Sequence, residues 1–227
     1  ADILLEKEIF LGSGNDILNV GNSIVEAPKS DFFSGGIGND LLKINISEDK
    51  TVSPDVEKFE KFEFSLNANS VFDFLDVSDL NEVEIIESSS GVNFQNLPFN
   101  LSDFEVNDNQ TGDWLMKYTD NSGSNPIIKW NNSSSSDSVI TSFALDEISS
   151  LTIISDGSRN VDINSLSLDD NDTKSLNISN NNDGNFLIST TSKIDSSSSI
   201  ENINLVTNQG GNIQLGSIQD NLGFDNA

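Results

Sequence analysis

Residues 35–43 of the chain read G-G-I-G-N-D-L-L-K, and residues 11–19 read L-G-S-G-N-D-I-L-N. The two stretches share the form x-G-x-G-N-D-x-L-x, a cluster of turn-forming residues followed at once by a short strand pattern. The second stretch fits the nonapeptide G-G-x-G-x-D-x-U-x, in which U is a large apolar residue, at every defined position. The first departs from it only at Leu11, which stands where the nonapeptide has glycine.

This arrangement of residues suits a calcium site. Glycine reaches backbone conformations that other residues avoid, so several carbonyl oxygens of a glycine-rich turn can point into one concavity. The Asp that closes each turn adds a carboxylate, and Ca²⁺ prefers about six to eight oxygen ligands. Because one turn supplies only part of such a shell, two stacked turns could share an ion. The alternative is a pair of Gly/Asn/Asp turns between strands, with no metal.

The composition restricts the classes of partner. The chain has 227 residues, which suits one or two domains, and its 11 Lys and Arg against 37 Asp and Glu give a formal charge of −26. So acidic a protein is a poor binder of nucleic acid or of anionic membranes. The acidity suits a protein that works among divalent cations or in salty water. A well-hydrated soluble surface would have the same composition.

The absence of two residue types restricts the chemistry. The chain has no Cys and no His. This excludes disulfides and thiolate sites, and it removes the commonest general base and the commonest transition-metal ligand. Calcium-dependent lyases with a β-helix use Arg or Lys as the base, whereas this chain has Arg159 as its single arginine and no clustered lysines. We therefore predict no enzymatic activity.

The sequence shows no targeting or membrane segment. Residues 1–6 read A-D-I-L-L-E and are followed by charge, unlike a signal peptide. No stretch approaches the roughly 20 apolar residues of a membrane-spanning helix. The chain begins without Met, which indicates a fragment or a processed product.

From about residue 58, short segments with alternating apolar residues occur in pairs, with a repeat of about 20 to 26 residues. The first members of the pairs are residues 59–66, 83–86, 104–106, 151–154, 176–178 and 200–206. The second members are residues 71–77, 92–97, 139–143, 161–166, 186–188 and 213–218. One such repeat cannot bury its apolar side alone, whereas stacked repeats form a continuous core. We therefore predict an all-β fold, a parallel β-solenoid or β-helix. An antiparallel β-sandwich is the alternative.

One segment interrupts the repeat. Residues 107–137 read as two strands with a long polar loop between them, which predicts a β-hairpin inserted into one repeat. The segment contains both tryptophans, the only tyrosine and the only methionine. Concentrated on a protrusion, Trp114, Tyr118 and Trp130 would form a partner-contact surface. Alternatively, they pack as a local core.

The predicted organisation therefore has three parts. Residues 1–57 form an N-terminal calcium-binding segment, and residues 58–219 form the β-solenoid with the hairpin inserted at about 107–137. Residues 220–227 form a tail without a strand pattern.

The glycine turns resemble the repeats of RTX proteins, which are secreted calcium-dependent toxins, proteases and adhesins of Gram-negative bacteria. The wider layout is similar to that of bacterial surface-layer (S-layer) proteins with RTX turns. In those proteins a G-x-x-G-N-D-x-F/L turn precedes a D-x-x-x-G-G-x-G-x-D-x-L-x-U turn and then V-E-x-V-x-U-type strands. The matching stretches here are residues 12–18, 31–44 and 56–64, and residues 199–205 resemble a second copy of the last element. The chain lacks the tandem nonapeptides of the toxins, which argues against a long calcium-triggered β-roll.

The resemblance implies a calcium-bound β-solenoid, export without a cleaved N-terminal signal, and assembly on the cell surface. By position it also implies a ligand set for Ca²⁺. Asp16 and Asp40 would supply carboxylates, while Asp31 could add a third or merely cap a turn. Backbone carbonyls would come from Leu11, Gly12, Ser13, Gly14, Gly35, Gly36, Ile37 and Gly38.

From these residues and this resemblance we expect one of two functions. The first is a structural component of a bacterial extracellular surface layer, which self-assembles with copies of itself into a calcium-stabilised lattice and could contact cell-surface polysaccharide. The alternative is an RTX-type adhesin module that binds glycans or other cells.

Overall fold

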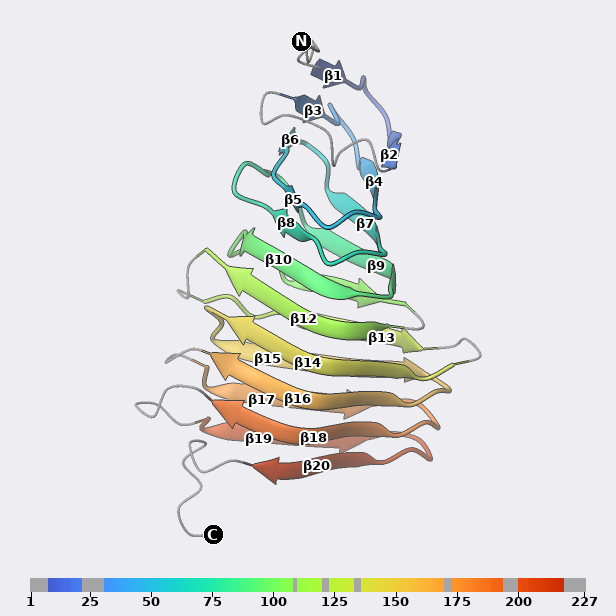
Figure 1. Cartoon of the computed structure of the whole chain (residues 1–227), viewed down its shortest axis with the longest axis vertical. Helices are drawn as coiled ribbons and strands as arrows, with labels where there is room; N and C mark the ends of the chain where they lie inside the picture. The colour runs from blue at the N-terminus through green and yellow to red at the C-terminus, as the bar shows by residue number, and fades with distance from the viewer. Residues whose placement is uncertain are drawn as a thin grey trace.

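The computed structural model describes residues 8–21, 31–107, 110–119, 123–132, 136–169, 173–193 and 200–218. These residues form a β-solenoid that widens from its N-terminal end toward its C-terminal end (Figure 1). All pairings between its strands are parallel, which confirms the predicted fold class. The described residues contain no helix that could span a membrane.

Two long sheets face each other along the solenoid, and a small sheet lies at its N-terminal end (Figure 1). The nine-stranded sheet consists of β2 (Ile17–Gly21), β4 (Leu41–Ile46), β7 (Lys61–Leu66), β9 (Glu82–Ser88), β11 (Asp103–Val106), β13 (Ile127–Asn132), β15 (Ser150–Gly157), β17 (Ser175–Asn180) and β19 (Asn202–Thr207). The eight-stranded sheet consists of β5 (Thr51–Val52), β8 (Val71–Asp73), β10 (Gly91–Leu97), β12 (Thr111–Tyr118), β14 (Ser138–Asp146), β16 (Val161–Asp169), β18 (Phe186–Lys193) and β20 (Ile213–Ile218). The small sheet consists of β1 (Glu8–Phe10), β3 (Phe32–Ser34) and β6 (Asp55–Glu57).

The alternation of apolar and polar residues decides which side of each strand is buried. In β7 the side chains of Phe62, Phe64 and Leu66 are buried, while the intervening polar residues are half-buried on the outer face. The parallel register then aligns apolar residues of successive coils in columns. One such column of buried side chains consists of Leu42, Phe62, Val83, Phe104, Ile128, Ile153 and Ile178. Each coil thereby covers the core of the next.

Most of the predicted strand pairs are confirmed, with first members in the nine-stranded sheet and second members in the eight-stranded sheet, although β8 covers only the start of residues 71–77. The pairing of residues 104–106 with 139–143 is wrong, because β12 follows β11 in its coil, and β13 and β14 form the next coil. The nine-stranded sheet continues across the predicted boundary at residue 57, because β4 pairs with β7, and one hydrophobic core extends from Phe33 to Ile200. The predicted tail, residues 220–227, lies outside the described residues.

The predicted hairpin is wrong. Its two strands, β12 and β13, lie in different sheets: β12 pairs with β10 and β14, and β13 pairs with β11 and β15. The segment therefore contributes to two successive coils of the solenoid, β12 to the first and β13 to the second. A long polar loop between two strands has the same sequence signal whether it closes a hairpin or turns a corner between sheets. Only the hydrogen bonds to neighbouring coils distinguish the two.

The predicted aromatic contact surface is wrong for the same reason. The rings of Trp114 and Trp130 stack across the core with centroids 5.3 Å apart, and their side chains are 1% and 0% exposed. Tyr118 is also buried, and its hydroxyl donates a hydrogen bond to the Leu101 carbonyl oxygen at 2.9 Å. Burial raises the pKa of this hydroxyl well above its usual range. These aromatic residues fill the core, where no partner can reach them.

Candidate metal site

The two glycine turns lie directly on top of each other at the N-terminal end of the solenoid. The first connects β1 to β2, and the second connects β3 to β4. Ser13 and Ile37 form a parallel bridge between the turns. The Gly14 N–H donates to the Ile37 carbonyl oxygen (2.8 Å), and the Ile37 N–H donates to the Gly12 carbonyl oxygen (3.0 Å). The structure thus brings together the two turns that the sequence singles out.

Close backbone approach explains the glycines of the second turn. A Cβ atom at Gly36 would lie 2.1 Å from the Gly12 carbonyl oxygen, and one at Gly38 would lie 1.9 Å from the Gly14 carbonyl oxygen. Both distances are impossible for a real side chain, so only glycine lets the turns stack. The first turn lies at the end of the stack, where a Cβ at Gly12 would meet no atom within 4 Å.

A ladder of three acidic residues follows the turns. The Asp16 N–H donates to Asp40 Oδ1 (2.7 Å), and the Asp40 N–H donates to Glu60 Oε2 (2.7 Å). The carbonyl oxygens of Asp16 and Asp40 in turn accept the N–H groups of Leu41 and Lys61. Glu60 was not predicted as a site residue, because its shorter turn contains no glycine. The available signal is its position directly before a strand, which matches that of the two aspartates.

Asp40 occupies the buried centre of this ladder. Its side chain is 1% exposed, and Oδ2 has no hydrogen-bond partner among the described residues. A Cβ at Gly35 would lie 2.8 Å from this oxygen and 1.8 Å from the Lys58 carbonyl oxygen, so both oxygens approach Gly35 from the same side. A buried carboxylate oxygen without a partner is strongly destabilising, and a bound cation would remove that penalty. The residues present therefore fit an oxygen-ligated cation such as Ca²⁺.

Apart from Asp31, the other predicted ligands are backbone carbonyl oxygens of the two turns. The carbonyl oxygens of Gly12 and Ile37 each accept one hydrogen bond and keep a second lone pair. The predicted carbonyls of Leu11, Ser13, Gly14, Gly35, Gly36 and Gly38 belong to the same stacked turns.

Asp31 does not belong to the stacked turns. It is buried, but it precedes β3 whereas Gly35 follows that strand. Roughly 10 Å of extended chain therefore separates it from the second turn.

A second acidic cluster lies on the outer face of the nine-stranded sheet. Carboxylate oxygens of Glu82, Glu84 and Glu105 lie within 4.8 Å of one another. The Lys61 ammonium group already lies among them, 2.6 Å from Glu82 and 2.7 Å from Glu84. Partial burial acts to lower the pKa of Lys61, but the hydrogen bonds to these two glutamates outweigh it and raise that pKa above its usual range. Because lysine supplies the positive charge, we assign no metal to this cluster.

No known protein family matches the chain, and no curated protein or solved structure is significantly similar to it. Its function is therefore inferred from the residues and their geometry.

Proposed function

We propose that the chain is a structural segment of a bacterial extracellular surface layer, stabilised by Ca²⁺ at the stacked glycine turns and assembled from copies of itself. The buried, unpartnered Oδ2 of Asp40 carries this proposal. It lies beside turns rich in carbonyl oxygens, in a chain with a formal charge of −26. The resemblance of the turns to RTX repeats supports the same metal and an extracellular location.

The residues that would hold Ca²⁺ are Asp40 and Asp16, together with carbonyl oxygens of the two turns. Calcium prefers such hard oxygen ligands, and it would neutralise carboxylates that the ladder places in adjacent coils. The ion would thus hold the N-terminal coils together where the solenoid is narrowest (Figure 1). This is a structural role for the metal, with no chemistry at the bound ion.

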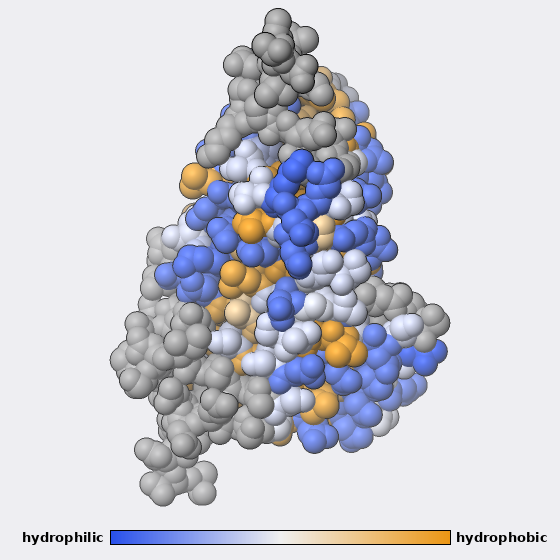
Figure 2. Space-filling model, in the orientation of Figure 1, coloured by the Kyte–Doolittle hydropathy of each residue, from blue (hydrophilic) through white to orange (hydrophobic). Residues whose placement is uncertain are grey.

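A structural role also suits the rest of the solenoid. Its interior is filled with apolar side chains. Figure 2 shows an outer face that is mostly hydrophilic, with hydrophobic residues scattered singly or in small groups. At the C-terminal end β19 exposes Leu205 and Val206, at 44% and 39%, beside a sheet edge. Such an edge can pair with a strand of another copy. The chain has no His or Cys, and we propose that it is not an enzyme.

A calcium titration of wild-type protein and the Asp40→Asn variant tests the metal site. We expect Ca²⁺ to raise the melting temperature of the wild type. The variant should lose this response and yet melt no lower than the wild type without calcium, because a neutral amide replaces a buried charge. Asp183→Asn, which removes an exposed carboxylate near the other end of the chain, is the matched control. Equal calcium responses in wild type and Asp40→Asn would refute the assignment.

Light scattering and electron microscopy of the same samples test the assembly. We expect millimolar Ca²⁺ to produce regular assemblies and chelation to dissolve them. Assembly that is indifferent to a chelator would contradict a calcium-stabilised lattice. Ordering by Ca²⁺ without assembly would instead favour the adhesin alternative. That alternative can no longer rest on Trp114, Tyr118 and Trp130, because all three are buried.

A further inference from the structure

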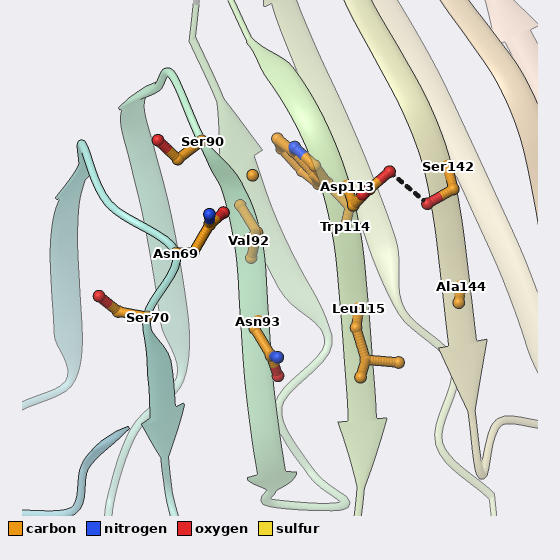
Figure 3. A pocket seen from close by; sticks show the side chains of 11 residues that line it. Asn69, Ser70, Ser90, Val92, Asn93, Asp113, Trp114, Leu115, Ser142 and Ala144 are labelled. Carbon is orange, nitrogen blue, oxygen red and sulfur yellow. Dashed lines mark hydrogen bonds between the residues drawn. The ribbon is translucent and has the colours of Figure 1, made fainter. Parts of the chain in front are cut away.

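A hollow of about 300 Å³ opens on the outer face of the eight-stranded sheet (Figure 3). Residues from β10, β12 and β14 line one side of it, and the turn before β8 lines the other. Its lining includes the side chains of Asn69, Ser90, Asn93, Asp113, Leu115 and Ser142. The hollow lies far along the chain from the glycine turns and is separate from the candidate calcium site.

The hollow exists because one strand of the sheet is short. β8 has three residues, and it pairs with β10 only through Phe94 and Gln95. The start of β10, Gly91 to Asn93, pairs with β12 on its other side. The sheet is therefore open between the start of β10 and the turn at Asn69, which Figure 3 shows facing each other. Glycine is required at position 91, where φ is +100° and a Cβ would lie 2.1 Å from the Asp113 carbonyl oxygen.

The rim of the hollow is polar and has one negative charge. Asp113 Oδ1 accepts a hydrogen bond from the Ser142 hydroxyl at 2.7 Å, which orients the carboxylate (Figure 3). The side-chain amide of Asn69 and the hydroxyl of Ser90 have no partner among the described residues, so both are available to a ligand. No Lys or Arg lines the hollow. This charge balance disfavours phosphate and carboxylate ligands.

The centre of the hollow is partly apolar. The strand register places Leu115 between Asn93 and Ala144 on the outer face, and Val92 also contributes to the lining. A sugar ring offers the complement to such a surface, since its hydroxyl edges form hydrogen bonds and its C–H face packs on apolar groups. The volume lies at the small end of the range for ligand pockets, about 300–1,000 Å³.

We propose that this hollow binds one neutral, hydroxyl-rich sugar unit, either free or as a residue of a glycan. Asp113 and Asn69 hydrogen-bond its hydroxyl groups, and Leu115 packs against its ring. The proposal does not rest on the calcium site. It identifies a specific place for carbohydrate contact on a chain in which Trp114, Tyr118 and Trp130 are buried.

Ligand-observed saturation-transfer NMR on the whole chain tests the proposal. The probes are methyl glycosides of glucose, galactose, mannose and N-acetylglucosamine at millimolar concentration. A disaccharide of each sugar distinguishes a glycan residue from a free sugar by its tighter binding. Every experiment is run with calcium and with a chelator.

Three variants make the test specific. Asp113→Ala should weaken binding by about tenfold, since this is the effect of losing one hydrogen bond to a charged group. Ala144→Phe should abolish binding by filling the hollow from the outer face. Asp162→Ala removes the same charge from the outer face of β16, outside the hollow, and should bind like the wild type. Circular dichroism checks that all three remain folded.

The proposal is overturned if no glycoside binds the wild type, or if Asp113→Ala and Ala144→Phe bind as well as the wild type does. Displacement of the sugar by millimolar phosphate would also overturn it, because the lining has no cation to hold an anion. If the sugar binds but Ca²⁺ does not raise the melting temperature, the calcium proposal is contradicted and the sugar proposal stands. If Ca²⁺ raises the melting temperature but no sugar binds, the sugar proposal is contradicted and the calcium proposal stands.

Discussion

The stacking of the glycine turns is open to a direct test by adding one methyl group. In Gly38→Ala the new Cβ would lie 1.9 Å from the Gly14 carbonyl oxygen and 2.6 Å from its carbonyl carbon. Both are backbone atoms, so neither can rotate away. The turns would have to move apart by roughly 1 Å to reach even the 3.0 Å limit of real Cβ contacts.

The energetic effect follows from the bonds that this movement breaks. The bonds from Gly14 N–H to the Ile37 oxygen and from Ile37 N–H to the Gly12 oxygen join the two turns. Each contributes about 0.5–1.5 kcal/mol, so we expect Gly38→Ala to destabilise the stack by about 1–3 kcal/mol. Gly12→Ala is the matched control, because its Cβ meets no atom within 4 Å. That variant should be neutral, or more stable by about 0.4–1 kcal/mol, since alanine restricts the unfolded chain.

Amide hydrogen exchange followed by NMR is the appropriate assay, because a solenoid can open at one end without unfolding globally. We expect the amides of Gly14 and Ile37 to exchange faster in Gly38→Ala, and amides of β14 to be unchanged. Gly12→Ala should retain wild-type protection. Equal protection in the two variants would refute the inference that close backbone contact dictates these glycines.

Three further predictions concern the core and the surface charges. Trp130→Ala should destabilise the protein by about 3–5 kcal/mol in urea unfolding, because it leaves a large cavity in the core, whereas the exposed Val139→Ala should have little effect. Because the folded state raises the pKa of Lys61, the protonated lysine stabilises the fold fully below its unfolded pKa of about 10.4. This stabilisation is lost as the pH rises through the folded-state pKa. The melting temperature of Lys61→Met should therefore fall less than that of the wild type in that alkaline range. Slight desolvation of the largely exposed Asp55, together with the neighbouring carboxylates of Asp76 and Glu57, raises the pKa of Asp55, so the folded state binds its proton more tightly than the unfolded state does. Asp55→Asn should consequently be more stable than the wild type at neutral pH, and its advantage should vanish as the pH falls below the unfolded value of about 3.9.

The sequence alone predicted the elements of the fold, because their signals are local. The alternation in residues such as 61–66 determines which side chains are buried, whatever the neighbouring strand is. The spacing of the pairs then indicated stacked repeats. The matching glycine turns indicated a site whose parts lie one coil apart, and the structure does stack them.

Features that depend on contacts between coils could not be predicted from the sequence. The segment at residues 107–137 has the same local pattern in a hairpin and in a solenoid coil, and parallel pairing decides for the coil. That pairing turns Trp114 and Trp130 inward. Glu60 joins the acidic ladder only because the strand register places it beside Asp40.

The sequence by itself thus determined the strands, their repeat and the turn chemistry, since each follows from the intrinsic preferences of neighbouring residues. Tertiary structure decided which carboxylate oxygen is left buried without a partner and where the sheet opens into a hollow. Both depend on how closely residues distant in the chain approach one another. That distance is set by packing between coils, and no local pattern encodes it.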